Sequence, residues 1–450
     1  MKNLWLFALI ASSLTVFASP SQAINEPGIS NTEIKLGASY PMSGGPGGVP
    51  GFKDFFVGAN AYFDYLNAMG GIYGRKVTVI YKDDRYQPQE AIVKNQELIL
   101  QDKVFALFNS APFPQAHIAV EKVVGINKRG IPDLALTSSF SLFSDMTKFP
   151  TTFAIAPNGK QESRVLLDYI KAYFPNLPLY RTYDSENDIG LDVKSVLLSY
   201  GDIFRDISTC ITSTSVPQPA PTYITDSCGL VDLKPYPTRN FNPVVEISVS
   251  SNSFPLFLRG SALWFAKLPN SINNTYASFY LPLVSDATDS FVAFYTEIIN
   301  KYSSGATVSQ SMIEGTDAAY VVSQALAAIG PEPTRKNIID FLRTKSSTLS
   351  SASFGLLNYG FRNDAGTKTQ FIAKFDGRTW NKVSDLFMVD VTGNVNTLAK
   401  ANRLPLLPNG LPVMKGVDAN KQQVVTCVKG KITKKIAGIN PKCPSGYTKK

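Results

Sequence analysis

From residue 33 onward, short apolar runs alternate with longer segments that carry apolar residues every three or four positions. The short runs indicate buried strands, and the longer segments indicate amphipathic helices. Four strands that alternate with helices are typical of a parallel sheet with helices on both faces. The expected strands are 33–40, 75–84, 104–108 and 131–137, and the expected helices are 52–69, 88–101 and 114–128, the last closed by Gly130.

A second alternating block follows, and the 450 residues, 44% of them apolar, suffice for two cores. Residues 208–243 are rich in Pro, Thr and Ser, and we expect an irregular, disulfide-tied excursion there. The other expected elements are a strand at 151–157, helices at 161–174, 289–302, 316–328 and 334–344, a strand at 276–283 and a closing β-pair at 354–364 and 369–377. Beyond about residue 389 the chain is expected to be loop-like.

Residues 1–23 are typical of a secretory signal peptide: Lys2 precedes an apolar run at 4–17, and Ser21-Gln22-Ala23 forms a small-x-small cleavage site. The run is too short to cross a bilayer. Because no cysteine lies near the cut, we expect cleavage after Ala23, no lipid anchor and an extracytoplasmic location.

The four cysteines allow three pairings. Loop-closure entropy favours the two local ones, Cys210–Cys228 and Cys427–Cys443. A zinc site is not expected, because these spacings and a single histidine offer too few ligands.

The positive charge is confined to the C-terminal end. Residues 415–450 contain nine lysines and one aspartate, which accounts for eight of the nine net positive charges. The rest of the chain is nearly neutral, so we do not expect it to bind nucleic acid. The basic tail either attaches to an anionic cell-wall or membrane surface or is a stapled, solubilising end without a partner.

Hydroxyl residues follow the fourth expected strand in "LALTSSFSLFSD", from Leu134 to Asp145. Open α/β sheets bind ligands at the carboxyl ends of their strands. Thr137, Ser138 and Ser139 are therefore expected near a ligand crevice, together with the loop 109–114. The alternative is that Ser139 or Ser141 only caps the following turn.

An ordered series of segments carries a family resemblance. These are "EIKLGASYPMSGGPG", "NAMGGIYGRK", "QDKVFALF", "GIPDLALTSSFSLFSD", "EGTDAAYVVSQAL" and "ASFGLLNYGFRNDAG". The series resembles the leucine-binding-protein-like substrate-binding proteins of ABC importers, over about 33–200 and 276–385.

The resemblance implies the α/β type I periplasmic binding fold: two Rossmann-like lobes with parallel sheets, joined by three crossovers, with a solute trapped between them. It implies a first lobe from 33–153 and 283–350 and a second from 154–282 and 351–390. Beyond the resemblance, composition indicates a Pro- and Gly-rich linker at 391–424 and a basic Cys-pair tail at 425–450. The implied partners are a small solute and an ABC permease, with no cofactor.

Position by position, the family's contacts to a ligand carboxylate fall on Thr137, Ser138 and Ser139. Phe113 replaces the family's hydroxyl residue after the third strand, with Ser110 nearby, and Ile189 replaces the second aromatic residue of a pattern that begins at Tyr183. No residue clearly matches the acidic partner of an amino-acid ammonium group, so Asp184 or Asp188 is the candidate there. Phe52, Phe113 and Tyr183 are candidate walls of the site.

No catalytic residue set is visible, and an enzyme is not expected. Asp83 and Asp84 are expected to end a strand and organise the lobe, and His117 to be a surface or half-buried helix residue. The favoured hypothesis is a solute-binding protein that captures a small carboxylate-bearing solute. The alternative is a secreted or surface-attached ligand-sensing or interaction protein on the same scaffold.

Overall fold

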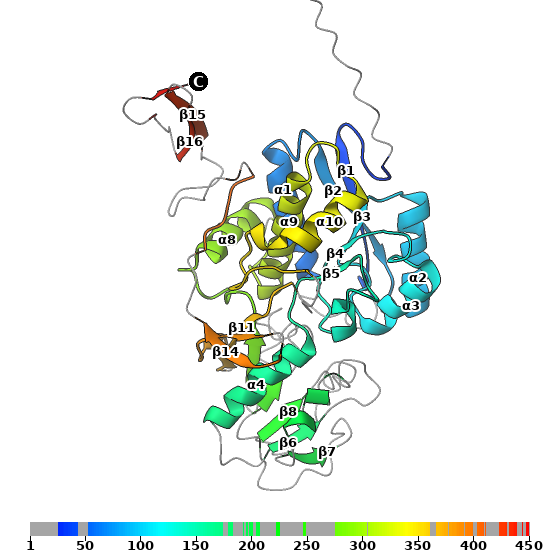
Figure 1. Ribbon diagram of the computed structural model, residues 1–450, viewed down its shortest axis with the longest axis vertical. Helices are drawn as coiled ribbons and strands as arrows, with labels where there is room; N and C mark the ends of the chain where they lie inside the picture. The colour runs from blue at the N-terminus through cyan, green and yellow to red at the C-terminus, as the bar shows by residue number, and fades with distance from the viewer. Residues whose placement is uncertain are drawn as a thin grey trace, which may run out of the picture.

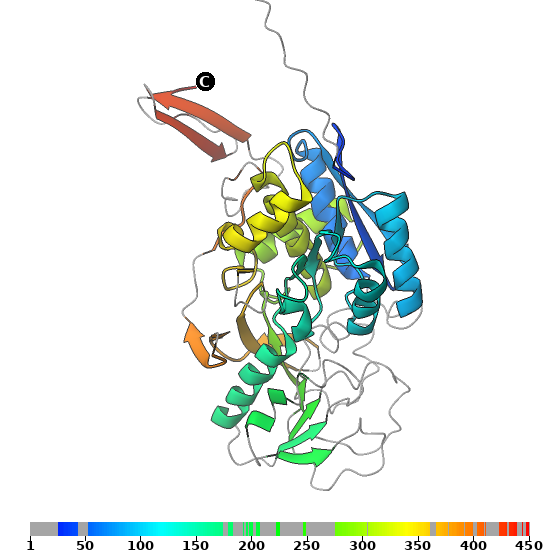
Figure 2. The same cartoon turned by 45° about the vertical axis from the view of Figure 1, so that its right-hand side comes forward.

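A computed structural model describes residues 26–43, 53–173, 275–303, 305–360, 366–376, 378–390, 392–398 and 403–408. Shorter described stretches lie at 179–182, within 192–200, and at 204–207, 222–225, 246–248, 423–429 and 432–438, with residues 410, 443 and 447–449. The strands form two large sheets and one small one. In Figures 1 and 2 the blue-to-cyan strands and the yellow helices make one lobe, and the green and orange strands make another.

The first lobe contains a five-stranded parallel sheet in the order β2-β1-β3-β4-β5. Its strands are β1 (Glu33–Tyr40), β2 (Lys76–Asp83), β3 (Ala106–Phe108), β4 (Asp133–Leu136) and β5 (Thr152–Ala154). One core joins the sheet to α1 (Asp54–Ala68), α8 (Ser290–Tyr302), α9 (Gln310–Ala328) and α10 (Arg335–Lys345). A second core joins it to α2 (Pro88–Gln96), its π-helical continuation Glu97–Gln101, and α3 (Pro114–Val124).

Local sequence explains where these helices begin and end. Asp289, Ser309 and Thr334 cap α8, α9 and α10 with side-chain oxygens that accept backbone N–H bonds. Helix α3 ends at Gly125, in the left-handed conformation that favours glycine, and the expected end at Gly130 was wrong.

Two glycines bring α1 and α9 into backbone contact. A Cβ added to Gly58 would lie 2.0 Å from the Met312 carbonyl oxygen, and one added to Gly315 would lie 1.7 Å from that of Phe55. Thr316 Oγ1 donates to the Gly58 carbonyl at 3.1 Å. This close crossing ties the late helices, from residues 290–345, to the sheet formed by the N-terminal strands.

The second lobe contains a nine-stranded mixed sheet in the order β14-β13-β11-β10-β9-β8-β6-β7, with β12 paired to β11. Strands β6 to β10 pair in parallel, and β11 to β14 add antiparallel strands. Helix α4 (Gly159–Tyr173) packs on this sheet. The strand bounds are β6 Leu179–Thr182, β7 Phe204–Ile207, β8 Thr222–Thr225, β9 Glu246–Ser248, β10 Thr275–Phe279, β11 Thr369–Phe375, β12 Trp380–Lys382, β13 Leu386–Val389 and β14 Val395–Leu398.

Two expectations for this lobe were wrong. Strand β8 lies inside the 208–243 segment that was expected to be irregular, because it pairs with β6 and β9 in the sheet interior. Strand β11 does not pair with residues 354–360; its partners are β10, β12 and β13. Neither segment has a clear hydrophobic periodicity in its sequence. Pairing with neighbouring strands determined the structure in both cases.

The chain passes between the two large sheets three times, after β5, after β10 and before β11. This is the architecture of the type I periplasmic binding fold, as predicted. The exact lobe boundaries stay a prediction.

Part of the expected linker at 391–424 packs on the two lobes, which corrects that prediction. Strand β14 belongs to the second sheet, and Arg403 pairs with Asp289 at 2.7 Å on the first lobe. Leu406 N donates to the Tyr320 hydroxyl at 2.8 Å, and Leu407 is buried. These contacts hold residues 403–408, which we call the strap, against α8 and α9. Any independent movement of the tail therefore involves only residues that follow the strap.

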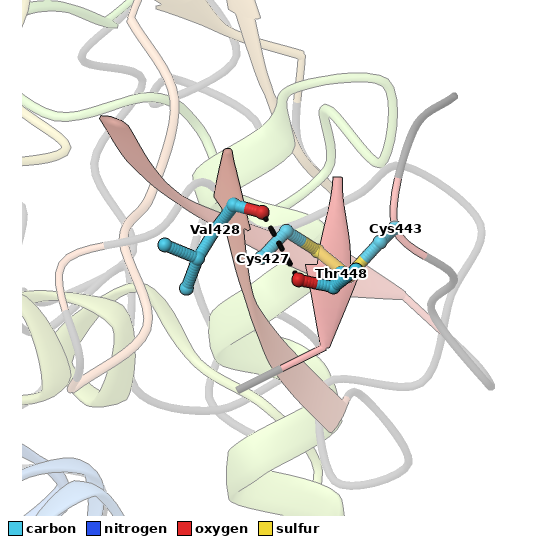
Figure 3. The surroundings of a disulfide bond; sticks show 4 residues. All are labelled: Cys427, Val428, Cys443 and Thr448. Carbon is cyan, nitrogen blue, oxygen red and sulfur yellow. Dashed lines mark hydrogen bonds between the residues drawn. A yellow bond between two sulfur atoms is a disulfide. The ribbon is translucent and has the colours of Figure 1, made fainter. Parts of the chain in front are cut away.

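The tail forms a small antiparallel sheet of β15 (Gln423–Lys429), β16 (Ile432–Gly438) and β17 (Thr448–Lys449). A disulfide joins Cys427 to Cys443, with 5.5 Å between the Cα atoms. Figure 3 shows it beside the hydrogen bond from Thr448 Oγ1 to the Val428 carbonyl oxygen, 3.3 Å long. The surface-binding hypothesis for this tail stays a prediction.

Candidate functional site

The ends of β3 and β4 lie side by side, because the two strands pair in parallel with Phe108 opposite Leu134. Asn109 follows β3 directly and is fully buried, with a φ of 48°. Asparagine tolerates this left-handed conformation better than most residues. The turn at Asn109 therefore ends the strand and brings its side chain to the residues after β4.

Asn109 fixes Thr137. Its Oδ1 accepts the backbone N–H and the hydroxyl of Thr137, each at 3.0 Å. Its Nδ2 has no hydrogen-bond partner among the described residues. A buried amide group whose two N–H hydrogens form no hydrogen bond destabilises the folded protein unless another group accepts them. The sequence placed the loop 109–114 near the crevice but did not single out Asn109, although an asparagine directly after a buried strand was a usable signal.

Ser138 and Ser139 are both buried. Ser138 Oγ accepts from Phe140 N at 3.4 Å, whereas Ser139 Oγ has no partner within the described part of the chain. The 3-10 turn η3 (Ser141–Ser144) that follows has Phe140 at its N-cap and no side-chain cap. Neither Ser139 nor Ser141 therefore performs the capping role that was the alternative reading.

Ser110 is used inside the first lobe. Its hydroxyl donates to Asn95 Oδ1 and accepts from Ser39 N, both at 2.9 Å, and its N–H donates to Asp133 Oδ1 at 3.3 Å. These bonds connect the residues after β3 to β1, α2 and β4. Ser110 therefore has a structural role, and its contact with a ligand stays a prediction.

Phe113 is half-buried at the N-cap of α3. Its ring meets Tyr86 edge-on, with 4.6 Å between centroids, and lies 6.5 Å from Tyr40. Such packing holds the ring as a rigid aromatic surface. This position is compatible with a wall of the site.

The two aspartates at the end of β2 organise the neighbouring loops, as expected. Asp83 accepts from Met42 N at 2.8 Å, from Ser43 N at 3.1 Å and from the Ser43 hydroxyl. Burial raises its pKa, but these bonds outweigh burial and hold the pKa below the usual range. Asp84 accepts from Ser39 Oγ at 2.9 Å, and burial raises its pKa to about 6.

His117 is fully buried, and the expected surface or half-buried position was wrong. Its ring packs on Phe143, with 4.5 Å between centroids, and its Nδ1 lies 3.8 Å from Asp133 Oδ2. Burial lowers the pKa of His117 to about 4 and raises that of Asp133 well above its usual value. His117 is therefore neutral at pH 7, and the pair is part of the core behind the strand ends.

Six predicted residues lie outside the described residues: Phe52, Tyr183, Asp184, Asp188, Cys210 and Cys228. Among the residues that are described, no cluster of three or more His, Cys, Asp or Glu side chains could hold a metal ion. No helix in the described ranges is long and apolar enough to cross a membrane.

Comparisons with known proteins agree with this fold. Residues 33–176 match the family model of periplasmic binding proteins. A possible leucine/isoleucine/valine-binding protein from Rhodopirellula baltica has 16% identity and a TM-score of 0.64, over 79% of this chain and 97% of that one. No curated protein matches the chain.

Two ligand complexes are also similar in structure. A branched-chain amino acid transporter substrate-binding protein from Streptococcus pneumoniae, in complex with isoleucine, has 14% identity and a TM-score of 0.60, over 78% of this chain and 100% of that one. An ABC transporter solute-binding protein from Rhodopseudomonas palustris, in complex with 3,4-dihydroxybenzoic acid, has 15% identity and a TM-score of 0.59, over 79% and 97%.

The fold is that of the type I periplasmic binding proteins, and residues 33–176 match the model of that family. The resemblance to the leucine-binding-protein-like substrate-binding proteins, predicted from the sequence, is confirmed.

Proposed function

We propose that this protein captures a small carboxylate-bearing solute between its two lobes and delivers it to an ABC importer. The observation that carries the proposal is a pair of buried groups at adjoining strand ends that have no hydrogen-bond partner among the described residues, Asn109 Nδ2 and Ser139 Oγ. Neutral donors of this kind bind a carboxylate through charge-assisted hydrogen bonds without a buried cation. Isoleucine and 3,4-dihydroxybenzoic acid, the ligands of two similar structures, are both carboxylic acids.

The proposed mechanism has no covalent step. The solute enters between the lobes, its carboxylate takes hydrogen bonds from the first lobe, and the second lobe closes over its other end. Thr137 and Ser138 border the anchor, and Phe113 supplies an apolar wall. Phe52, Tyr183 and either Asp184 or Asp188 are proposed to complete the pocket. Release follows when the permease separates the lobes.

The proposed location is extracytoplasmic, with the signal peptide removed after Ala23 and no lipid anchor. The exported chain would carry the Cys427–Cys443 pair into an oxidising compartment, where disulfides persist. N-terminal sequencing of the secreted protein tests the cleavage site.

Thermal unfolding tests the function. The mature chain is heated with isoleucine, leucine, 3,4-dihydroxybenzoate, octanoate, and with leucinamide as the counterpart without a carboxylate. A ligand at a hundred times its Kd stabilises the native state by about 2.7 kcal/mol, so the midpoint rises clearly. We expect at least one carboxylate to raise it and leucinamide to leave it unchanged. If no carboxylate raises it, including after refolding to remove a co-purified ligand, the proposed function is contradicted.

A further inference from the structure

A carboxylate of one lobe is held by an element of the other. Asp192 Oδ2 accepts the backbone N–H of Ser141, and Asp192 Oδ1 accepts its hydroxyl, both at 2.7 Å. Lys160 Nζ lies 3.4 Å from Asp192 Oδ1. The Asp192 side chain is only 8% exposed, so its charge is held mainly by these three donors.

The partners belong to different lobes. Ser141 opens the η3 turn, whose Phe143 packs with Leu136 at the end of β4 in the first lobe. Asp192 lies four residues before Val196, and Val196 packs in the second-lobe core against α4 and β11. Lys160 is in the first turn of α4, directly after the first crossover.

The first-lobe side of the contact lies near a strand end, because β4 ends at Leu136 and Ser141 follows Ser139 by two residues. This is the edge at which an open α/β sheet binds ligands. Separating the lobes there would break two short charge-assisted bonds and expose a carboxylate.

We propose that Ser141, Lys160 and Asp192 form an interlobe latch that holds the two lobes together in the absence of a solute. Bidentate, charge-assisted hydrogen bonds to a buried carboxylate are among the stronger polar contacts in proteins. The latch biases the ligand-free protein toward the arrangement in Figures 1 and 2, and a solute enters when it opens.

Small-angle X-ray scattering of the ligand-free mature chain tests the latch without any solute, so its result is independent of the proposed function. Asp192→Asn keeps the side-chain shape but removes the charge and one acceptor. Ser141→Ala removes the hydroxyl and keeps the N–H. Asp340→Asn is the matched control, because Asp340 pairs with Lys336 on the exposed surface of α10.

The latch predicts a larger radius of gyration for Asp192→Asn and for Ser141→Ala than for the wild type and the control. Loss of these bonds should shift the equilibrium between separated and joined lobes about tenfold to a hundredfold. The double variant should resemble Asp192→Asn, because the two changes break one contact. Unchanged radii in both single variants, or a wild type that already scatters as separated lobes, would overturn the proposal.

Discussion

Asn109 Oδ1 accepts both the backbone N–H and the hydroxyl hydrogen of Thr137, at 3.0 Å each. The hydroxyl hydrogen of Thr137 is thus used in a hydrogen bond within the protein. We therefore describe Thr137 as a residue that positions Asn109 and not as a donor to a carboxylate. In contrast, Asn109 Nδ2 donates no hydrogen bond within the described structure. In the proposed site we therefore assign the polar anchor to Asn109, and the contact of Thr137 with a ligand stays a prediction.

Asn109→Asp tests this assignment. The substitution keeps an acceptor oxygen for Thr137 and a residue that tolerates the positive φ, but it replaces the donor nitrogen with a second oxygen. A carboxylate ligand then faces a like charge, which costs several kcal/mol. At pH 8 we expect the affinity for the carboxylate that binds the wild type to fall by more than about a hundredfold, as measured by calorimetry. Wild-type affinity in this variant would exclude Asn109 from the site.

Ser139→Ala and Ser110→Ala should have opposite effects on the free protein. Ser139 Oγ has no partner among the described residues, so its removal should leave the unfolding free energy unchanged or raise it. Ser110 Oγ is bonded to Asn95 and Ser39, so its loss should cost about 1–3 kcal/mol. Urea denaturation measures both values. Ligand affinity should fall about tenfold or more in Ser139→Ala, and equal destabilisation by the two changes would contradict the assignment.

His117 should make stability depend on pH. Its pKa is about 4 in the folded protein and 6.5 in the unfolded chain, so the unfolded state binds the extra proton between these values. Its contribution is present above pH 6.5 and is lost as the pH falls toward 4, by about 3 kcal/mol at most.

The difference between wild type and His117→Gln, measured by urea denaturation from pH 4 to 7.5, isolates this effect from Asp84. Asp84 acts in the opposite sense, because its raised pKa of about 6 removes stability as the pH rises from 3.8 to 6. A pH-independent difference between the two proteins would show that His117 does not titrate as its burial requires.

Arg403 should hold the strap 403–408 to the first lobe. It pairs with Asp289, whose side chain is 5% exposed, and its guanidinium lies 4.2 Å from the ring centroid of Phe354. Arg403→Ala removes the charged partner of the buried Asp289 carboxylate, which keeps only its capping bonds to α8, and should cost about 3–5 kcal/mol. Truncation directly before Arg403 should be similarly destabilising, whereas truncation after Gly410 should be nearly neutral in thermal unfolding. Equal stability of the two truncations would contradict the docked strap.

The sequence predicted the first lobe closely because the hydrophobic residues of its strands and helices recur with a clear periodicity. The expected strand 33–40 coincides with β1, and the expected helix 289–302 with α8 and its Asp289 cap. Short strands without a period, such as β8 and β14, were not foreseen because pairing with neighbours decides their structure.

The candidate site was predicted less completely. Strand-end hydroxyls were visible in the sequence, but the hydrogen-bond partners that decide their tasks come from distant residues. Ser110 is bonded to Ser39 and Asn95, and Ser141 is bonded to Asp192 in the other lobe. No local spacing encodes these contacts.

The most direct measurement is a crystal structure of the mature chain with the carboxylate that raises its unfolding midpoint. The proposed function predicts electron density for the ligand between the lobes, with its carboxylate oxygens within hydrogen-bonding distance of Asn109 Nδ2 and Ser139 Oγ. A ligand bound elsewhere, or a carboxylate that points away from the ends of β3 and β4, would contradict it.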